Sequence, residues 1–384
     1  MITRDIAYIG VDDTDLDLFE SQYIIPNGIS YNSYLIKDEK IAIMDTADNR
    51  KIDEWLGNLR TALDGRTPDY LVVQHMEPDH AGCIAEILEE YPAIKIVASA
   101  RAIQMMPQFF EGKDFSQNAI AVKEGDTLSL GEHTLQFFMA PMVHWPEVMV
   151  TYDKKDKVVF SADGFGKFGA LSHEEDWACE ARRYYFNICG KYGGPVQALL
   201  KKLATLDVEC ICPLHGPILK ENLGYCIGLY DTWSKYDVET EGVFIAYASI
   251  HGGTAAVANV MAEILREKGA KKVSVADLSR DDMAEAIEDA FRMDKMIVAA
   301  ASYDGGVFPV MHDFLHHLQI KAYQKRRVGI IENGSWAPCA GRVMRGMLEQ
   351  MKDVEIVEPM VTILSRMKQS DRAALEALAD AILK

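Results

Sequence analysis

The sequence predicts a layered α+β domain followed by a doubly wound α/β domain with a parallel sheet, and three observations support this. The chain has 384 residues, more than one hydrophobic core usually supports, so two domains are expected. Short strand-like runs joined by Gly and charged turns dominate up to about residue 240. After the polar segment 234–242, strand-like and helical runs alternate, which is typical of a parallel sheet. We therefore place the domains at 1–240 and 241–384.

The first domain contains a predicted hairpin and a later meander. Apolar runs at 29–35 and 41–45 flank the polar tetrapeptide Lys37-Asp38-Glu39-Lys40, which indicates a hairpin. Further strands are expected at 127–130, 134–139, 148–152 and 158–161, and helices at 81–90, 174–189 and 196–206. This pattern predicts an α+β layered domain whose loops gather at one edge.

The second domain alternates strands with helices. Strands are expected at 243–248, 272–277, 296–301, 328–331 and 354–357, and helices at 255–268, 283–293, 310–322, 342–351 and 372–383. Five such units in about 140 residues predict a parallel, doubly wound sheet of flavodoxin-like order.

Composition limits the partners and the compartment. The formal net charge of −18 makes a nucleic acid or an anionic membrane an unsuitable partner, because binding to these depends on clustered Lys and Arg. The seven cysteines lack the paired spacing of a disulfide framework. Cys210 and Cys212 alternate along a strand, so we expect them to share a core face. No targeting segment or membrane span is recognisable, and a cytoplasmic location is expected.

Four side chains that commonly bind metal ions stand within six residues, directly after the apolar run 70–73. They are His75, Glu77, Asp79 and His80. In an extended chain, residues two apart point the same way and lie about 6–7 Å apart. His75, Glu77 and Asp79 are therefore expected to face one pocket, while His80 approaches from the next turn. This arrangement favours two metal ions rather than one.

Three more potential metal ligands each follow an apolar strand-like run and precede a Gly or Pro turn. They are His144, Asp163 and His215. The remaining isolated histidines are interpreted as surface or core residues without a role: His133, His173, His312, His316 and His317.

A Gly-containing loop follows the first strand of the second domain, where open α/β sheets bind ligands. It consists of Ser249, Ile250, His251, Gly252, Gly253 and Thr254. Its glycines would let backbone N–H groups approach a phosphate at the positive end of the next helix. The loop lacks the Gly-Lys-Ser/Thr of nucleotide triphosphatases and the Gly-x-Gly-x-x-Gly of dinucleotide sites. A singly phosphorylated ligand fits better, although an ordinary strand-to-helix turn explains this loop alone equally well.

Two later loops combine Gly with a large aromatic residue at predicted strand ends. One consists of Ser302, Tyr303, Asp304, Gly305 and Gly306, and the other of Asn333, Gly334, Ser335, Trp336 and Ala337. The aromatic side chains could stack on a flat ring while backbone groups reach its polar edge. The three loops together predict a site for flavin mononucleotide (FMN).

The spacing His-x-Glu-x-Asp-His, followed by His, Asp and His, resembles the metallo-β-lactamase fold, an αββα sandwich. Hydrolases of that superfamily have His where this chain has Glu77, and they commonly hold zinc. A carboxylate adds a hard oxygen donor and suits iron better. Together with the flavodoxin-like domain, the chain resembles the flavodiiron proteins, also called A-type flavoproteins, over nearly its whole length.

This resemblance implies a set of ligands for two irons. One iron would be held by His75, Glu77 and His144. The other would be held by Asp79, His80 and His215, with Asp163 as the bridge. In some family members the histidine that matches His80 turns away. The three loops of the second domain match the family's FMN loops, although His251-Gly252-Gly253 differs from the Tyr-Gly-Asn often found there.

The resemblance also implies an activity and partners. The expected reaction is reduction of dioxygen to water, of nitric oxide to nitrous oxide, or of both, with Tyr192 and Trp145 as candidate hydrogen-bond donors to the bound gas. Family members associate head to tail, with one subunit's flavin beside the other's irons, so a homodimer or a dimer of dimers is expected. The chain has no rubredoxin-like Cys-x-x-Cys pair, so electrons are expected from a separate donor such as rubredoxin or reduced deazaflavin.

Two other functions remain open at this point. The first is a zinc hydrolase with an appended flavodoxin-like domain, which metal analysis would distinguish. The second is a non-enzymatic flavin electron carrier whose N-terminal site is structural. Such a carrier would reoxidise after anaerobic reduction without catalytic turnover.

Overall fold

The structure is a computed structural model that describes residues 2–384, and the chain forms two compact units. The first unit contains the residues up to Tyr185 together with Tyr192–Asp231. The second contains Phe186–Lys191 and Thr232–Lys384. Within the described residues, no helix is both long enough and apolar enough to cross a bilayer.

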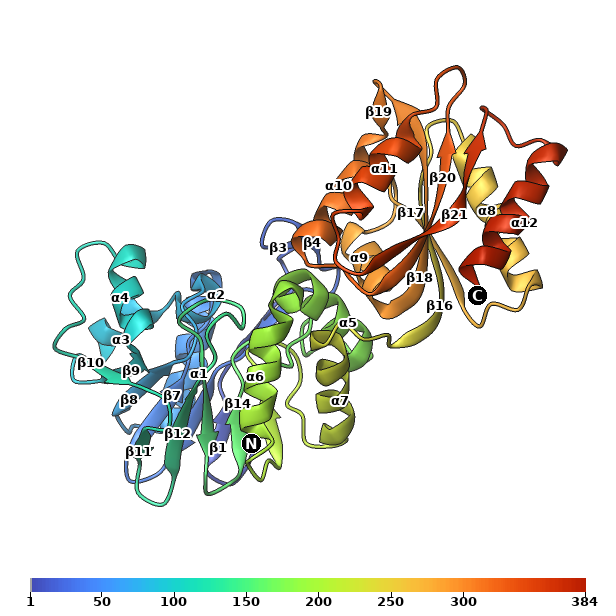
Figure 1. The fold of residues 1–384 in the computed structure, drawn as a ribbon. Coiled ribbons are helices and arrows are strands. Elements are labelled where there is room, and N and C mark those ends of the chain that lie inside the picture. Colours follow the sequence, from blue (N-terminus) through green and yellow to red (C-terminus); the bar gives the residue numbers. More distant parts are fainter. Residues whose placement is uncertain (1) are drawn as a thin grey trace. The chain divides into compact units, whose positions relative to one another are not determined.

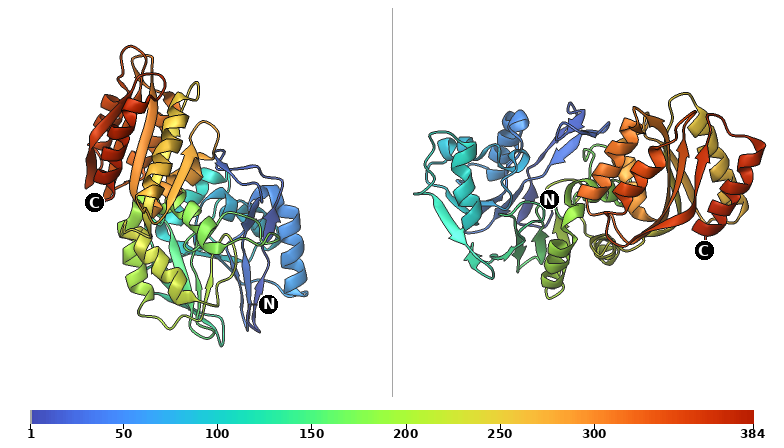
Figure 2. Two further views of the ribbon diagram at one scale, coloured as in Figure 1. Left: turned by 90° about the vertical axis from the view of Figure 1, so that its right-hand side faces the viewer. Right: turned by 45° about the horizontal axis from the view of Figure 1, so that its top comes forward.

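The first unit is a sandwich of two sheets with helices outside them (Figures 1 and 2). One sheet has the order β1-β6-β7-β8-β9-β10, and its strands are Ile6–Tyr8, Tyr34–Lys37, Ile41–Met44, Tyr70–Val73, Lys95–Ser99 and Ala119–Val122. The other has the order β11-β12-β13-β14-β15, and its strands are Thr127–Ser129, Thr134–Met139, Met149–Asp153, Val158–Phe160 and Cys210–Cys212. Two short pairs lie apart from these sheets: β2 (Val11–Asp13) with β5 (Ile29–Tyr31), and β3 (Leu18–Phe19) with β4 (Tyr23–Ile24).

Alternate residues of the two sheets form the core between them. Ile36 and Val72 of the first sheet belong to the same buried cluster as Phe137 and Phe160 of the second. The intervening positions of the first sheet are also fully buried, at Leu35, Ile43, Leu71 and Ile96. A sheet covered on both faces needs apolar side chains at successive positions, which explains the continuous apolar runs of its strands.

Cys210 and Cys212 lie in this same core, as expected from their alternation along a strand. Their sulfur atoms are 3.8 Å apart, and both cysteines are free thiols. The prediction of a shared core face is therefore confirmed.

The helices of the first unit differ in part from those predicted. They are α1 (Ile52–Leu63), α2 (Pro78–Ala81), α3 (Ile84–Glu90), α4 (Ala100–Phe109), α5 (Trp177–Tyr184) and α6 (Gly193–Leu203), and α7 (Leu223–Ser234) follows. The helix expected at 81–90 is interrupted after Ala81 and resumes at Ile84. The helix expected at 174–189 is α-helical only over α5 and continues with wider π turns over Tyr185–Cys189.

The second unit has the predicted flavodoxin-like sheet. Its strands are β16 (Thr240–Ala248), β17 (Val273–Asp277), β18 (Met293–Tyr303), β20 (Arg326–Asn333) and β21 (Val354–Ile363). They are parallel and lie in the order β17-β16-β18-β20-β21, while the short β19 (Gly306–Val307) pairs with the end of β18. The order of successive strands reverses beside β16, since β17 lies on one side of it and β18 on the other, and this places a ligand crevice at the carboxyl ends of the strands.

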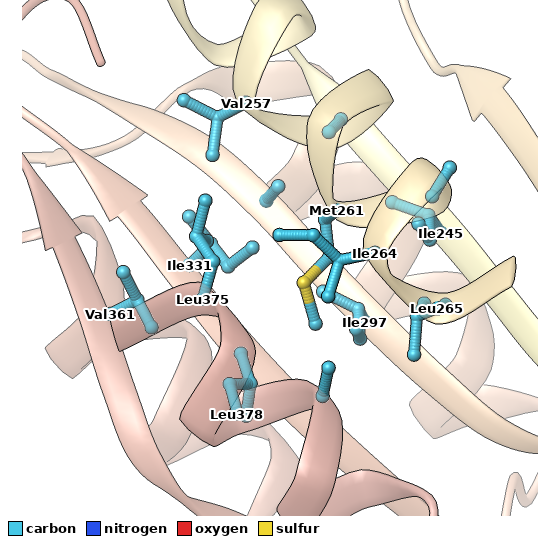
Figure 3. Close-up of a cluster of buried hydrophobic side chains, with 14 of the residues drawn as sticks. Ile245, Val257, Met261, Ile264, Leu265, Ile297, Ile331, Val361, Leu375 and Leu378 are labelled. Carbon is cyan, nitrogen blue, oxygen red and sulfur yellow. The ribbon is translucent and has the colours of Figure 1, made fainter. Parts of the chain in front are cut away.

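Helices cover both faces of this sheet (Figure 1). α8 (Gly253–Glu267) and α12 (Arg372–Ile382) lie on one face, and α9 (Met283–Arg292), α10 (Pro309–Ile320) and α11 (Ala340–Leu348) lie on the other. Figure 3 shows Met261 and Ile264 of α8 and Leu378 of α12 facing Ile297 and Ile331 of the sheet. This packing fixes the start of α8 at the carboxyl edge of the sheet.

Replacing Leu378 with Ala is expected to lower the free energy of unfolding of the second unit by about 2–5 kcal/mol, because it leaves a cavity in this core. Leu378 is fully buried. Urea unfolding of the full chain, followed by circular dichroism, measures the loss. Leu364→Ala is the matched control, since Leu364 is 51% exposed, and its effect is expected to stay within about 0.5 kcal/mol. Equal effects of the two variants would contradict the assignment of the core.

His133 forms a buried pair with Asp153 at the edge of the second sheet. Its Nδ1 lies 3.0 Å from Asp153 Oδ2. Burial would lower the pKa of His133, but the hydrogen bond with Asp153 and the charge of that carboxylate raise it overall. The histidine interpreted above as a residue without a role is therefore part of a buried hydrogen-bonded pair.

This pair predicts a pH dependence of stability. A histidine whose pKa is raised by folding binds its proton more tightly in the folded state, so its stabilisation is complete below about pH 6.5 and is lost as the pH rises through the folded pKa. The free energy of unfolding is therefore expected to fall with rising pH more steeply in the parent chain than in His133→Gln. Urea titrations at a series of pH values above 6 measure both slopes. Parallel slopes would refute the expectation.

Candidate metal centre and ligand pocket

Strand direction brings the predicted metal ligands to one edge of the sandwich. β12 and β14 both pair antiparallel with β13, and β15 is parallel to β14, so β12, β14 and β15 end at the same edge. His144, Asp163 and His215 follow these three strand ends, and the segment 75–80 follows β8 of the facing sheet. The structure brings all seven predicted ligands together in two adjoining clusters.

The first cluster contains His75, Glu77, His144 and Asp163. Glu77 Oε2 lies 3.1 Å from His75 Nε2 and 3.0 Å from His144 Nε2. Asp163 Oδ2 lies 3.2 Å from each of the same two nitrogens. Two imidazole nitrogens and two carboxylate oxygens therefore face one point.

The second cluster contains Asp79, His80 and His215. Asp79 Oδ2 lies 3.2 Å from the Nε2 atoms of both His80 and His215. The other oxygen of Asp163, Oδ1, lies 3.2 Å from His80 Nε2 and 3.8 Å from His215 Nε2. Asp163 thus presents one oxygen to each cluster, and His80 points into the site.

The extended geometry expected for residues 75–79 is wrong beyond Glu77. Pro78 begins α2, so Asp79 and His80 lie on a helical turn and Asp79 does not share the direction of His75 and Glu77. Proline is favoured at the first helical position because it needs no amide donor there. The turn separates the segment into two pairs of ligands, and each pair serves a different cluster.

The buried charges of the two clusters shift one another's pKa values. Burial would lower the pKa of His75, but Asp163, Glu147 and Glu77 raise it well above its ordinary value. Burial would also lower the pKa of His144, but Asp163 and Glu77 raise it to about 9. The histidines in turn hold the pKa of Asp163 well below its usual range despite its burial. A metal ion must displace protons from these histidines, so metal binding is expected to weaken as the pH falls.

Several buried polar atoms in the clusters make no hydrogen bond within the described residues. They are both carboxylate oxygens of Asp79 and Asp163, both ring nitrogens of His80, and Nε2 of His215. Buried polar atoms without partners are rare in folded proteins and call for an ion or water. Mixed imidazole and carboxylate donors match the preferences of non-haem iron. The residues present therefore fit a pair of metal ions.

Three residues behind the ligands were missed by the sequence reasoning. Glu147 Oε1 lies 2.8 Å from His75 Nδ1, and the carbonyl oxygen of Ser30 lies 2.7 Å from His215 Nδ1. Asp45 is fully buried and accepts hydrogen bonds from the backbone N–H and the side chain of Gln74. Metal-binding histidines usually donate their outer N–H to a carboxylate or carbonyl. The sequence signal that could have identified Glu147 was therefore a glutamate three residues after the predicted ligand His144.

The two candidate hydrogen-bond donors occupy different positions. The ring of Trp145 packs edge-on against His75, with ring centroids 5.2 Å apart. Tyr192 is the residue before α6. The role of both residues toward a bound gas stays a prediction.

The three Gly-containing loops of the second unit surround one cavity of about 590 Å³, a size typical of small-ligand sites. Fourteen of the sixteen predicted loop residues line it, and Gly252 and Gly306 do not. Trp336 stands at the rim and is 91% exposed. An aromatic side chain this exposed beside a cavity is suited to stacking on a flat ligand.

One end of this cavity lies at the start of α8. Ser249 Oγ is buried and makes no hydrogen bond within residues 2–384. Gly252, in the left-handed region at φ 81°, is the N-cap of this helix and provides no side-chain hydrogen bond to its first N–H groups. A hydroxyl without a partner beside a helix N-terminus fits a phosphate group. The residues present therefore fit FMN.

The cavity has further walls that the sequence reasoning missed. Ala301, Cys339, Ser365 and Arg366 also line it. Asn333 connects these walls, because its side-chain amide donates to Thr254 Oγ1 and to the Ser365 carbonyl, at 3.3 and 2.9 Å. The loop after β21 thus forms part of the pocket.

Comparisons with known proteins agree with both halves of the chain. A family model described as "ODP family beta lactamase" matches residues 29–216. An uncharacterised protein of Methanocaldococcus jannaschii is 30% identical over 357 residues, which cover 91% of this chain and 89% of that protein. The anaerobic nitric oxide reductase flavorubredoxin of Escherichia coli is 28% identical, with 88% of this chain and 72% of the relative covered.

A solved structure extends the similarity to the entire chain. The rubredoxin oxygen:oxidoreductase of the anaerobe Desulfovibrio gigas superposes with a TM-score of 0.93 at 27% identity. The match covers 100% of this chain and 97% of that one. The similarity therefore includes both the sandwich and the parallel sheet.

Proposed function

We propose, from the premise that this chain belongs to the flavodiiron protein family, that it reduces dioxygen to water, nitric oxide to nitrous oxide, or both. The supporting observation is that one carboxylate, Asp163, faces two adjoining clusters of buried ligands in a chain that also has an FMN-sized pocket. Two metal ions sharing one carboxylate are suited to a substrate that takes up several electrons at once.

The ligands divide between two irons as follows. His75, Glu77 and His144 would hold one, Asp79, His80 and His215 the other, and Asp163 would bridge them. When bound, two irons changing from ferrous to ferric supply two electrons and a reduced FMN supplies two more, which matches the four that dioxygen needs and exceeds the two that a pair of nitric oxide molecules needs. The protein's own contribution is to hold the ligands in a buried, carboxylate-rich site and to exclude side reactions.

The flavin pocket would hold FMN by both of its ends. The start of α8 and Ser249 would bind the phosphate, and the loops that carry Tyr303 and Trp336 would contact the ring. The names of the relatives, rubredoxin oxygen:oxidoreductase and flavorubredoxin, support rubredoxin as the electron donor, with reduced deazaflavin as the alternative. We also propose a head-to-tail homodimer or dimer of dimers in the cytoplasm. Seven free thiols support a reducing compartment.

The decisive experiment loads the purified protein with iron and FMN and measures both cofactors before turnover. After anaerobic reduction, dioxygen and nitric oxide are supplied separately and their consumption is followed in the steady state. We expect two irons and one FMN per chain and catalytic consumption of at least one gas. Zinc in place of iron together with hydrolytic activity would support the hydrolase instead, and a single reoxidation without turnover would support an electron carrier.

A further inference from the structure

Glu147 lies directly behind the metal ligand His75. Its side chain is buried, with 1% of the residue exposed. Glu147 Oε1 accepts hydrogen bonds from His75 Nδ1–H at 2.8 Å and from the Met76 backbone N–H at 2.9 Å. Glu147 follows His144 in the loop between β12 and β13, so one loop contributes a metal ligand and a support for a second one.

This contact fixes the tautomer of His75. An ionised carboxylate can only accept hydrogen bonds, so His75 must carry its proton on Nδ1. Nε2, the nitrogen left to bind a metal, faces Glu77 and Asp163, which lie 3.1 and 3.2 Å away.

The second cluster lacks an equivalent charge among the contacts of the described residues. The outer nitrogen of His215 bonds the neutral carbonyl oxygen of Ser30 at 2.7 Å. The outer nitrogen of His80 is buried without a hydrogen bond in the described chain. An imidazole that donates to a carboxylate becomes a stronger metal ligand than one that donates to a carbonyl. The two metal positions are therefore unequal in donor strength.

We propose that Glu147 is a positioning residue that makes the two metal positions inequivalent. It holds the ring of His75 toward the metal and strengthens its donation, so the position held by His75, Glu77 and His144 binds its metal more tightly and favours the more oxidised state. The inference rests on the proposed function for the identity of the metal, while the difference between the positions follows from the contacts of His75, His80 and His215.

Ser99 offers a matched control. Its hydroxyl donates to the Glu147 backbone carbonyl at 2.8 Å and accepts from the Ala102 N–H at 3.1 Å at the start of α4. Ser99→Ala removes an anchor of the same loop but leaves the carboxylate in place. A purely structural role of Glu147 would give similar effects in both variants.

The test compares Glu147→Gln, Glu147→Asp and Ser99→Ala as metal-loaded, FMN-containing protein. A chelator competition follows the release of each metal, and a redox titration follows its potential. In Glu147→Gln, one of the two metals is expected to be released about 10–100-fold more readily and to be reduced at a higher potential. The other metal should keep its parent affinity. Glu147→Asp keeps the charge and should retain the parent potential, and Ser99→Ala should leave both metals unchanged.

Two results would overturn the proposal. One is parent-like release and potential of both metals in Glu147→Gln, and the other is the same loss in Ser99→Ala as in Glu147→Gln. If Glu147→Gln fails to fold, Glu147→Asp decides, since a potential shifted despite the retained charge also contradicts the proposal. The chelator experiment works with any bound metal. Zinc-loaded protein without gas reduction would therefore refute the proposed function without deciding the role of Glu147.

Discussion

Asp163→Ala is expected to remove both metals from the chain at once. Asp163 Oδ2 lies 3.2 Å from His75 Nε2 and His144 Nε2, while Oδ1 lies 3.2 Å from His80 Nε2. The variant therefore takes one oxygen donor from each position. It also removes the negative charge between two cations, whose repulsion is strong in a buried site. The rate of gas reduction is expected to fall by more than ~100-fold, because even the loss of a residue that only hydrogen-bonds to a metal ligand lowers metal affinity or activity by about 10–100-fold.

Asp79→Ala is the matched control for this result. Asp79 Oδ2 faces only the second cluster, at 3.2 Å from His80 Nε2 and His215 Nε2. Its loss should release one metal and leave the other in the first cluster. Metal analysis after gel filtration measures the number of metal ions per chain in both variants. The FMN content of both should stay at the parent level. Two metals retained by Asp163→Ala, or both lost by Asp79→Ala, would contradict the bridging arrangement.

The second unit could be predicted closely because its strands and helices have distinct periodicities. Strand order followed from the alternation alone, and the loops after β16, β18 and β20 were placed at the pocket from their Gly and aromatic residues. The end of β21 was predicted too early, at 357. Pro359 lies within this strand, which runs to Ile363. β21 is an edge strand, where a missing N–H costs no ladder hydrogen bond. Ser365 and Arg366, which form a part of the pocket wall that was not predicted, follow this strand.

The first unit was harder because long-range pairing determines it. The short pairs β2 with β5 and β3 with β4 have two or three residues per strand, too few for a period to appear. The metal-ligand residue types could be identified because they stand at the ends of apolar runs. Glu147 could not be assigned to His75, because the two are 72 positions apart and meet only when the loop after β12 folds against the segment after β8.

Gly253→Ala is expected to weaken FMN binding without affecting the metal clusters. Gly253 is the first residue of α8, and a Cβ there would lie 2.5 Å from the Ser365 carbonyl oxygen and 3.3 Å from Asn333 Nδ2. The oxygen belongs to the backbone, so the loop after β21 must move away from the pocket. Overpacking of this kind costs about 1–3 kcal/mol, which corresponds to roughly a 5- to 150-fold loss of affinity.

Gly346→Ala makes the same chemical change where there is room for it. Gly346 lies inside α11, and a Cβ there would meet nothing within 4 Å, so FMN affinity should be unchanged. Fluorescence titration of flavin-free protein with FMN measures both variants, and metal content serves as the internal reference. Equal FMN affinities would show that the contact of α8 with the loop after β21 does not shape the pocket. A loss confined to Gly253→Ala would place the phosphate end of the flavin at the start of α8, because that is where the backbone is forced to move.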